Sequence, residues 1–132
     1  MHVTLGILTL SALANTPDAD ITRALDDFTQ GAAERDVTRV ERSLHPEARQ
    51  FVFMPDGLQV LDRPTYVSLL KAEKIGGVPT ERATVAVRID GLRATATQVR
   101  NMGEMALHDT LTLVREGDDW RIVSVAVEVV KP

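Results

Sequence analysis

The sequence predicts an α+β fold in which helices precede an antiparallel sheet, and three observations support this class. Apolar residues recur at helical spacing between residues 18 and 33. Residues 84–130 instead contain segments rich in Thr, Val, Leu and Ile that are separated by tight turns, as in consecutive strands. Among them, residues 108–124 form two extended segments joined by the polar turn at 116–119. Helices followed by strands are typical of a domain with its helices on one sheet face.

The first predicted helix covers residues 18–33, and its buried stripe has helical spacing: Ile21, Ala24, Leu25 and Phe28. Asp36 is placed to cap the start of a second, shorter helix. This helix should end at His45-Pro46, because the residue before a proline is disfavoured in the helical conformation. His45 would then lie against the last carbonyl groups of that helix.

A short hairpin and a third helix follow. Residues 49–54 predict a strand, Pro55-Asp56-Gly57 a turn, and residues 58–61 the returning strand. Asp62 then caps a third helix that runs to a stop at Gly76-Gly77.

The remaining chain predicts four strands, at residues 84–89, 92–100, 104–115 and 120–130. The last of them is apolar on both faces between residues 123 and 130, which is typical of a strand that is covered on both sides. Helices would cover one face. The same sheet of a second subunit would cover the other, since isologous dimers are the commonest soluble oligomers. We therefore expect a homodimer formed through the sheet.

The composition is that of one globular domain and limits the classes of site and partner. A chain of 132 residues can form a hydrophobic core without disulfides or metals. It has no cysteine, which excludes disulfides, thiolate metal sites and thiol catalysis. The net charge of −4, the scattered basic residues and an aromatic content of 4% argue against a nucleic-acid partner.

We expect neither a metal nor a cofactor. The three histidines, His2, His45 and His108, lack the spacing of a metal-binding motif. The glycines in residues 75–79 belong to a helix stop and turn, and a Gly-x-Ser-x-Gly nucleophile elbow does not occur.

The N-terminal segment, residues 1–17, leaves two alternatives open. Residues 1–14 are mostly apolar and end in small residues, as in a signal peptide, but no Lys or Arg precedes the apolar run. The segment is therefore either an arm that packs on the body or on a second subunit, or the remnant of an export signal. It is too short for a membrane span. We expect residues 18–132 to form one domain in the cytoplasm, or outside it if the segment is an export signal.

The order of short motifs resembles a known family. The motifs are Leu44-His45-Pro46-Glu47-Ala48, Asp56-Gly57, Tyr66, Asp109-Thr110-Leu111-Thr112-Leu113 and Gly117-Asp118-Asp119-Trp120-Arg121-Ile122-Val123. Over residues 18–127 the chain resembles nuclear transport factor 2-like (NTF2-like) proteins, and most of all the branch of SnoaL-like and putative lumazine-binding proteins. The resemblance implies a cone-shaped, cystatin-like fold. Three helices would pack on a curved antiparallel sheet and leave a pocket at the open end.

The implied pocket suggests candidate ligand-binding residues, namely Tyr66, His108, Asp109 and Phe53. Asp109 is the unusual one, because it shares its strand face with Leu107, Leu111 and Leu113, and a carboxylate there must be paired, hydrogen-bonded or functional. His108 faces the opposite side of that strand. The alternatives are a core tyrosine at position 66 and a structural carboxylate at 109 that binds the backbone or an arginine.

Three functions remain open. The first is binding of a small apolar molecule without catalysis. The second is a cyclase, isomerase or dehydratase of the SnoaL-like type, with Asp109 as general base and His45 or Tyr66 as its partner. The third is a structural or interaction dimer whose cavity is filled by side chains.

Overall fold

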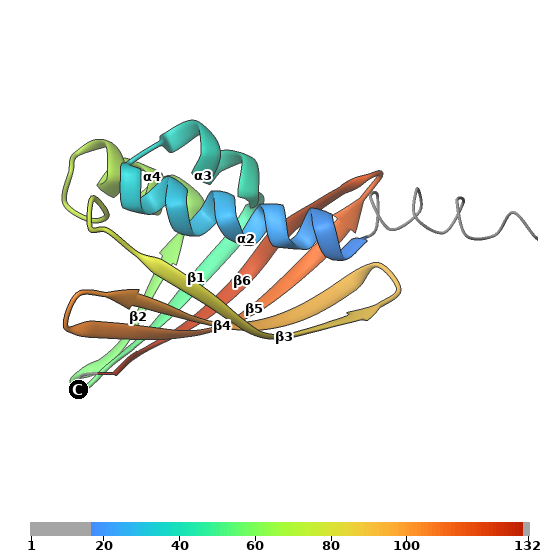
Figure 1. Ribbon diagram of the computed structural model, residues 1–132. Coiled ribbons are helices and arrows are strands. Elements are labelled where there is room, and N and C mark those ends of the chain that lie inside the picture. The colour runs from blue at the N-terminus through green and yellow to red at the C-terminus, as the bar shows by residue number, and fades with distance from the viewer. Residues whose placement is uncertain (1–16, 131–132) are drawn as a thin grey trace, which may run out of the picture.

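The computed structural model describes residues 17–130, which form three helices on one side of a six-stranded sheet (Figure 1). The helices are α2 (Pro17–Glu34), α3 (Val37–Ser43) and α4 (Arg63–Lys71). The strands are β1 (Leu44–Met54), β2 (Gly57–Asp62), β3 (Glu81–Asp90), β4 (Arg93–Met102), β5 (Met105–Glu116) and β6 (Asp119–Val130). The predicted α+β class is therefore confirmed. The predictions for residues 1–16 of the N-terminal segment fall on residues outside the described ones. Pro17 belongs to α2.

The sheet has the order β2-β1-β6-β5-β4-β3 and is mixed. Every neighbouring pair is antiparallel except β1 and β6, which run parallel. The expected purely antiparallel sheet is therefore corrected at this one pair. The reason is topological: β6 lies between the β1–β2 hairpin and strands β3–β5, and the long connection from β1 through β2, α4 and β3–β5 lets it run in the same direction as β1.

The predicted N-caps are confirmed, whereas α3 and α4 both end before their predicted stops. Helix α4 ends at Lys71 and not at Gly76-Gly77, and the positive φ of 57° at Glu73 is incompatible with a continued helix. The side chain of Asp36 accepts a hydrogen bond from the Arg39 N–H, and that of Asp62 accepts one from the Thr65 N–H. Helix α3 ends at Ser43, so His45-Pro46 already belongs to β1. The pre-proline position favours extended backbone, and the irregular β1–β6 register between Leu44 and Arg49 accommodates the missing proline N–H.

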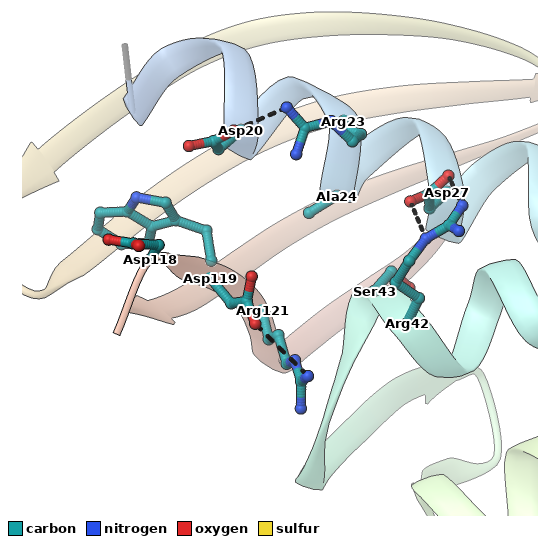
Figure 2. A pocket seen from close by; sticks show the side chains of 10 residues that line it. Asp20, Arg23, Ala24, Asp27, Arg42, Ser43, Asp118, Asp119 and Arg121 are labelled. Carbon is teal, nitrogen blue, oxygen red and sulfur yellow. Dashed lines mark hydrogen bonds and ion pairs between the residues drawn. The ribbon is translucent and has the colours of Figure 1, made fainter. Parts of the chain in front are cut away.

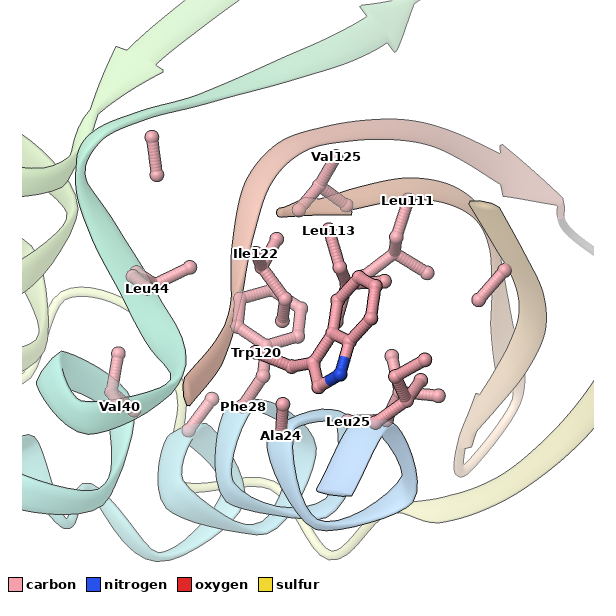
Figure 3. Packing of buried hydrophobic residues seen from close by; sticks show 14 of the residues in the cluster. Ala24, Leu25, Phe28, Val40, Leu44, Leu111, Leu113, Trp120, Ile122 and Val125 are labelled. Carbon is pink, nitrogen blue, oxygen red and sulfur yellow. The ribbon is translucent and has the colours of Figure 1, made fainter. Parts of the chain in front are cut away.

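The core lies between α2 and the inner face of the sheet (Figure 3). The predicted stripe of α2 is buried throughout, and Leu25 and Phe28 are fully inaccessible. Trp120 is also buried beside this helix (Figure 3). The sheet residues of this core are Leu44, Ala48, Ala94, Ala96, Leu111, Leu113, Trp120, Ile122, Val125 and Val127.

An irregularity in the β5–β6 register explains the apolar run on β6. Between Thr112 and Leu113 the register shifts, so Ile122 and Val125 are both buried although they are three positions apart, an offset that would put them on opposite faces of a regular strand. Beyond the shift the outer face of β6 carries Ser124, Ala126 and Glu128. That face is therefore more polar than the expected strand with two apolar faces.

In residues 17–130, none of the helices is both long and apolar enough to cross a bilayer.

Candidate functional site

A cavity of about 250 Å³ lies on the inner side of the sheet, beside α4 and the end of α2. Most of its wall is aliphatic. The lining residues are Ala32, Gln50, Val52, Gln59, Leu61, Tyr66, Ile75, Gly76, Arg100, Met102, Leu107, Val127 and Val129. Arg100 is the one side chain in this set that carries a charge at neutral pH. The cavity is thus an apolar pocket with a few polar groups.

The charge of Arg100 is balanced by Asp109 within the core. Arg100 Nε donates to Asp109 Oδ2 at 2.6 Å, and Nη2 donates to Oδ1 at 2.8 Å. Gln98 Nε2 donates a third hydrogen bond to Asp109 Oδ2, at 2.8 Å. Both side chains of the ion pair are buried. A bidentate pair of this kind holds the guanidinium in a fixed plane.

Aromatic rings flank this ion pair. The guanidinium of Arg100 lies over the Phe28 ring, 5.1 Å from its centroid. The rings of Phe28 and Tyr66 stack at a centroid distance of 6.0 Å. Helices α2 and α4 therefore place their aromatic rings beside the guanidinium of Arg100.

Gln50 and Tyr66 are the neutral polar groups in the deeper wall of the cavity. Gln50 is 5% exposed, and its Nε2 has no hydrogen-bond partner of standard geometry within residues 17–130. Burial raises the pKa of the Tyr66 phenol, and Asp109 raises it further, whereas Arg100 and a hydrogen-bonding contact with the Gln50 side chain lower it. Tyr66 is therefore a neutral O–H donor at physiological pH.

Of the predicted site residues, Tyr66 lines the cavity and Asp109 lies directly behind it, bound to Arg100. Phe53 and His108 lie elsewhere. In the sheet register, both of them pair with Glu128, on the outer face, and both are exposed. They face away from the cavity because side chains alternate between the two faces of a sheet.

His45 lies far from Asp109. Its Nε2 is 2.9 Å from Glu116 Oε1, at the other end of β5, and its Nδ1 accepts the Glu47 N–H at 3.0 Å. Asp109 and Glu116 are seven residues apart on an extended strand, a separation of about 23 Å. The structure therefore does not bring His45 and Asp109 together. The expected position of His45 against the carbonyls of the preceding helix is replaced by these two contacts.

Sequence reasoning missed Arg100, Gln50 and Gln98. The available signal was their position: Gln98 and Arg100 share the strand face of Ala94 and Ala96, which are buried. Polar residues on a buried face need partners. The same reasoning that singled out Asp109 would have found its arginine.

The loop after α4 forms part of the cavity wall and is fixed to the end of α2. Ile75 and Gly76 line the cavity. Arg35 Nε donates to the Ile75 carbonyl at 3.1 Å, and the Gly77 N–H donates to the Ala32 carbonyl at 3.0 Å. Gly76 has a positive φ of 74°, which a glycine adopts without strain.

A second concavity, of about 310 Å³, lies between α2, α3 and the β5–β6 turn (Figure 2). Its aspartates and arginines are paired with one another. Burial alone would raise the pKa of Asp27, but hydrogen bonds from Arg42 and Arg39 outweigh this and lower it. These pairs join α2 to α3 (Figure 2), and the charges are already compensated. We assign this region a structural role.

Within the described residues there is no group of three or more His, Asp or Glu side chains that could hold a metal ion.

Comparison with known proteins identifies the family of the chain. Residues 16–126 match the family described as Putative lumazine-binding. The chain belongs to this family. The match covers nearly the whole described region, including the cavity-lining strands β1, β2 and β4. No curated protein matches the chain.

Solved structures confirm the resemblance to NTF2-like proteins. An NTF2-like protein from Shewanella baltica has a TM-score of 0.77 at 17% identity, with 86% of this chain and 94% of that chain covered. One from Silicibacter pomeroyi has a TM-score of 0.75 at 19% identity, with 85% and 94% covered. A cystatin-like protein from Nostoc punctiforme has a TM-score of 0.71 at 10% identity, with 86% and 90% covered. At these identities the likeness establishes the fold.

Proposed function

We propose that this protein binds a small molecule in the cavity on the inner side of its sheet. The observation that carries the proposal is the composition of the wall, which is mostly aliphatic and whose polar side chains are Gln50, Gln59, Tyr66 and Arg100. Such a pocket is the usual form of a small-molecule site. The description of the family, which refers to lumazine binding, also supports a small ligand. An open volume of about 250 Å³ argues against an interior filled by side chains.

The bonding of Asp109 favours binding over general-base catalysis. Both carboxylate oxygens accept hydrogen bonds from the Arg100 guanidinium, and Oδ2 accepts another from Gln98. Accepting a proton would cost the carboxylate its ion pair in a buried environment. A general base also has to reach its substrate. Asp109 lies behind Arg100 and is not among the lining residues.

Filling the cavity tests the proposal. Val129 lines the cavity, whereas Val130 is exposed on the other face of the same strand. We expect Val129→Trp to abolish retention of small molecules and Val130→Trp to leave it unchanged. The measurement is mass spectrometry of solvent extracts from the purified full-length protein and both variants. A compound that is retained equally by all three proteins would contradict the proposed site.

We also propose that a second copy of this chain covers the outer face of the sheet. The evidence is an apolar cluster on the β1–β2 hairpin: Phe53 is 53% exposed, Leu58 55% and Val60 49%. Phe53 pairs with Leu58, and Phe51 with Val60, so these side chains lie together on the outer face. Exposed apolar clusters of this kind are typical of interaction sites.

A further inference from the structure

We propose that the ligand is a compact, uncharged molecule with an acceptor oxygen, such as a ketone, ester or amide carbonyl, that Gln50, Tyr66 and Arg100 receive. This inference rests on the proposed function and specifies the chemistry of the same cavity. Three features of the wall carry it: an unpaired buried amide, a guanidinium whose charge is already neutralised, and a protonated phenol.

The unpaired amide calls for an acceptor. Gln50 lies on a buried strand position that pairs with Val125, and its side chain is 95% inaccessible when the cavity is empty. A buried N–H without a partner is costly, so nearly all such groups in proteins are satisfied. Gln50 Nε2 has no partner of standard geometry among the described residues. Because Nε2 itself has almost no accessible surface, the amide has to turn toward the cavity before a ligand oxygen can accept its hydrogen bond.

The ion pair selects against a charged ligand. Arg100 Nε and Nη2 bind Asp109, which leaves Nη1 outside the pair. Nη1 can still donate a hydrogen bond, but the nearby carboxylate cancels most of the attraction that the guanidinium would exert on an anion. A ligand carboxylate would lose its hydration without a matching counter-charge, and this makes its burial unfavourable. A neutral carbonyl avoids this cost.

The third polar group and the size of the cavity complete the description. Tyr66 keeps its proton, since burial raises its pKa, and thus presents a donor. The remaining wall is aliphatic apart from Gln59, and the volume of about 250 Å³ lies just below the range of ~300–1,000 Å³ for typical ligand sites. A compact molecule with one polar end and an apolar body matches these walls.

Three probes of similar size distinguish the classes of ligand: acetophenone has a neutral carbonyl group, ethylbenzene has no polar group, and benzoate is an anion. Dissociation constants would be measured by NMR titration of the full-length protein at pH 7. We expect acetophenone to bind at least about tenfold more tightly than benzoate. Tighter binding of benzoate would overturn the inference by showing that the site prefers an anion.

The variant Gln50→Leu tests the role of the amide. Gln30→Leu is the matched control, because Gln30 is a half-buried glutamine of α2 that donates to the Thr80 carbonyl and does not line the cavity. Gln50→Leu should weaken acetophenone roughly five-fold, the contribution of one neutral hydrogen bond, and leave ethylbenzene unchanged or tighter. Its thermal midpoint should stay close to that of the wild type, because Gln50 Nε2 makes no hydrogen bond of standard geometry within residues 17–130. Gln30→Leu should change neither affinity.

The outcomes also separate this inference from the proposed function. If Gln50→Leu does not weaken acetophenone binding, or if Gln30→Leu weakens it equally, the assignment of the ligand oxygen to Gln50 is wrong although the cavity still binds small molecules. If none of the three probes binds the wild-type protein, both proposals fail. If Gln50→Leu does not fold, the order of acetophenone and benzoate on the wild-type protein still decides whether the ligand is neutral.

Discussion

Arg100 and Asp109 are each stable in the core only because the other is present. Asp109 is 2% exposed and Arg100 6%. Removing one member of such a pair leaves an uncompensated buried charge, whereas replacing both by apolar residues of similar size is often tolerated. The pair also determines which surface of the guanidinium the cavity presents. Stability and ligand recognition therefore depend on the same two side chains.

This dependence predicts that Asp109→Ala lowers the free energy of unfolding by about 3–5 kcal/mol. The double variant Arg100→Met, Asp109→Leu should lose much less, because it leaves no unpaired charge. Urea denaturation of the two variants and the wild type measures the difference. A loss below about 1 kcal/mol in Asp109→Ala would contradict a buried ion pair.

The burial of the Tyr66 phenol predicts that the protein loses stability at high pH. Burial raises the pKa of its phenol above the ordinary value of 10.0, so the folded state holds the proton more tightly than the unfolded state. The stabilisation from the protonated phenol is complete below pH 10 and decreases as the pH rises above 10. Tyr66 is the only tyrosine of the chain, so Tyr66→Phe isolates its effect.

We expect the free energy of unfolding of Tyr66→Phe to fall less steeply than that of the wild type between pH 9 and 11. Urea denaturation across this range gives both slopes. Equal slopes would mean that the phenol is not buried as described.

At the scale of elements, the cavity depends on how the loop after α4 meets α2. A Cβ atom at Gly76 would lie 2.4 Å from the Ala32 carbonyl oxygen, and the positive φ adds strain for any other residue. Arg35 holds the same loop through the Ile75 carbonyl. These contacts fix one wall of the cavity.

Gly76→Ala should therefore destabilise the protein by about 1–3 kcal/mol and weaken ligand retention, because the loop has to move away from α2. Gly91→Ala is a suitable control. It also has a positive φ but has open space around it, so it should lower stability without affecting the cavity. Thermal unfolding and the extraction assay measure the two effects. A Gly76→Ala variant with the thermal midpoint and the ligand retention of the wild type would contradict the close packing of this loop.

The local elements could be predicted from the sequence, but the contacts between them could not. The stripe on α2 and the caps Asp36 and Asp62 are encoded in short segments and were confirmed. The parallel pairing of β1 with β6 was missed, since strands so distant in the chain leave no local sign of their relative direction. The burial of Asp109 followed from its strand face, whereas its partner Arg100 depended on the unknown β4–β5 register.

At the scale of the whole molecule, the two faces of the sheet have different roles. The inner face carries the core and the cavity. The outer face carries His108 and the apolar cluster of β1 and β2, where Phe53, Leu58 and Val60 are exposed. Placing these side chains against a second copy would remove apolar surface from water at roughly 25 cal/mol per Å².

The double variant Phe53→Glu, Val60→Glu should therefore reduce self-association, since it places like charges in the proposed contact. Val78→Glu, an exposed apolar residue outside this cluster, is the control and should leave the mass unchanged. Sedimentation equilibrium of all three proteins gives the masses. A wild-type protein that is monomeric at high micromolar concentration would contradict the proposed dimer.

The account depends most directly on where a ligand binds. A ¹H–¹⁵N correlation spectrum recorded during titration of the full-length protein with acetophenone would locate it. We predict that the largest shifts occur at the Gln50 side-chain amide and at the backbone amides of Arg100 and Val127, which line the cavity. Shifts confined to the outer face, around Phe53 and Val60, or to the charged concavity at Asp27 would contradict the account.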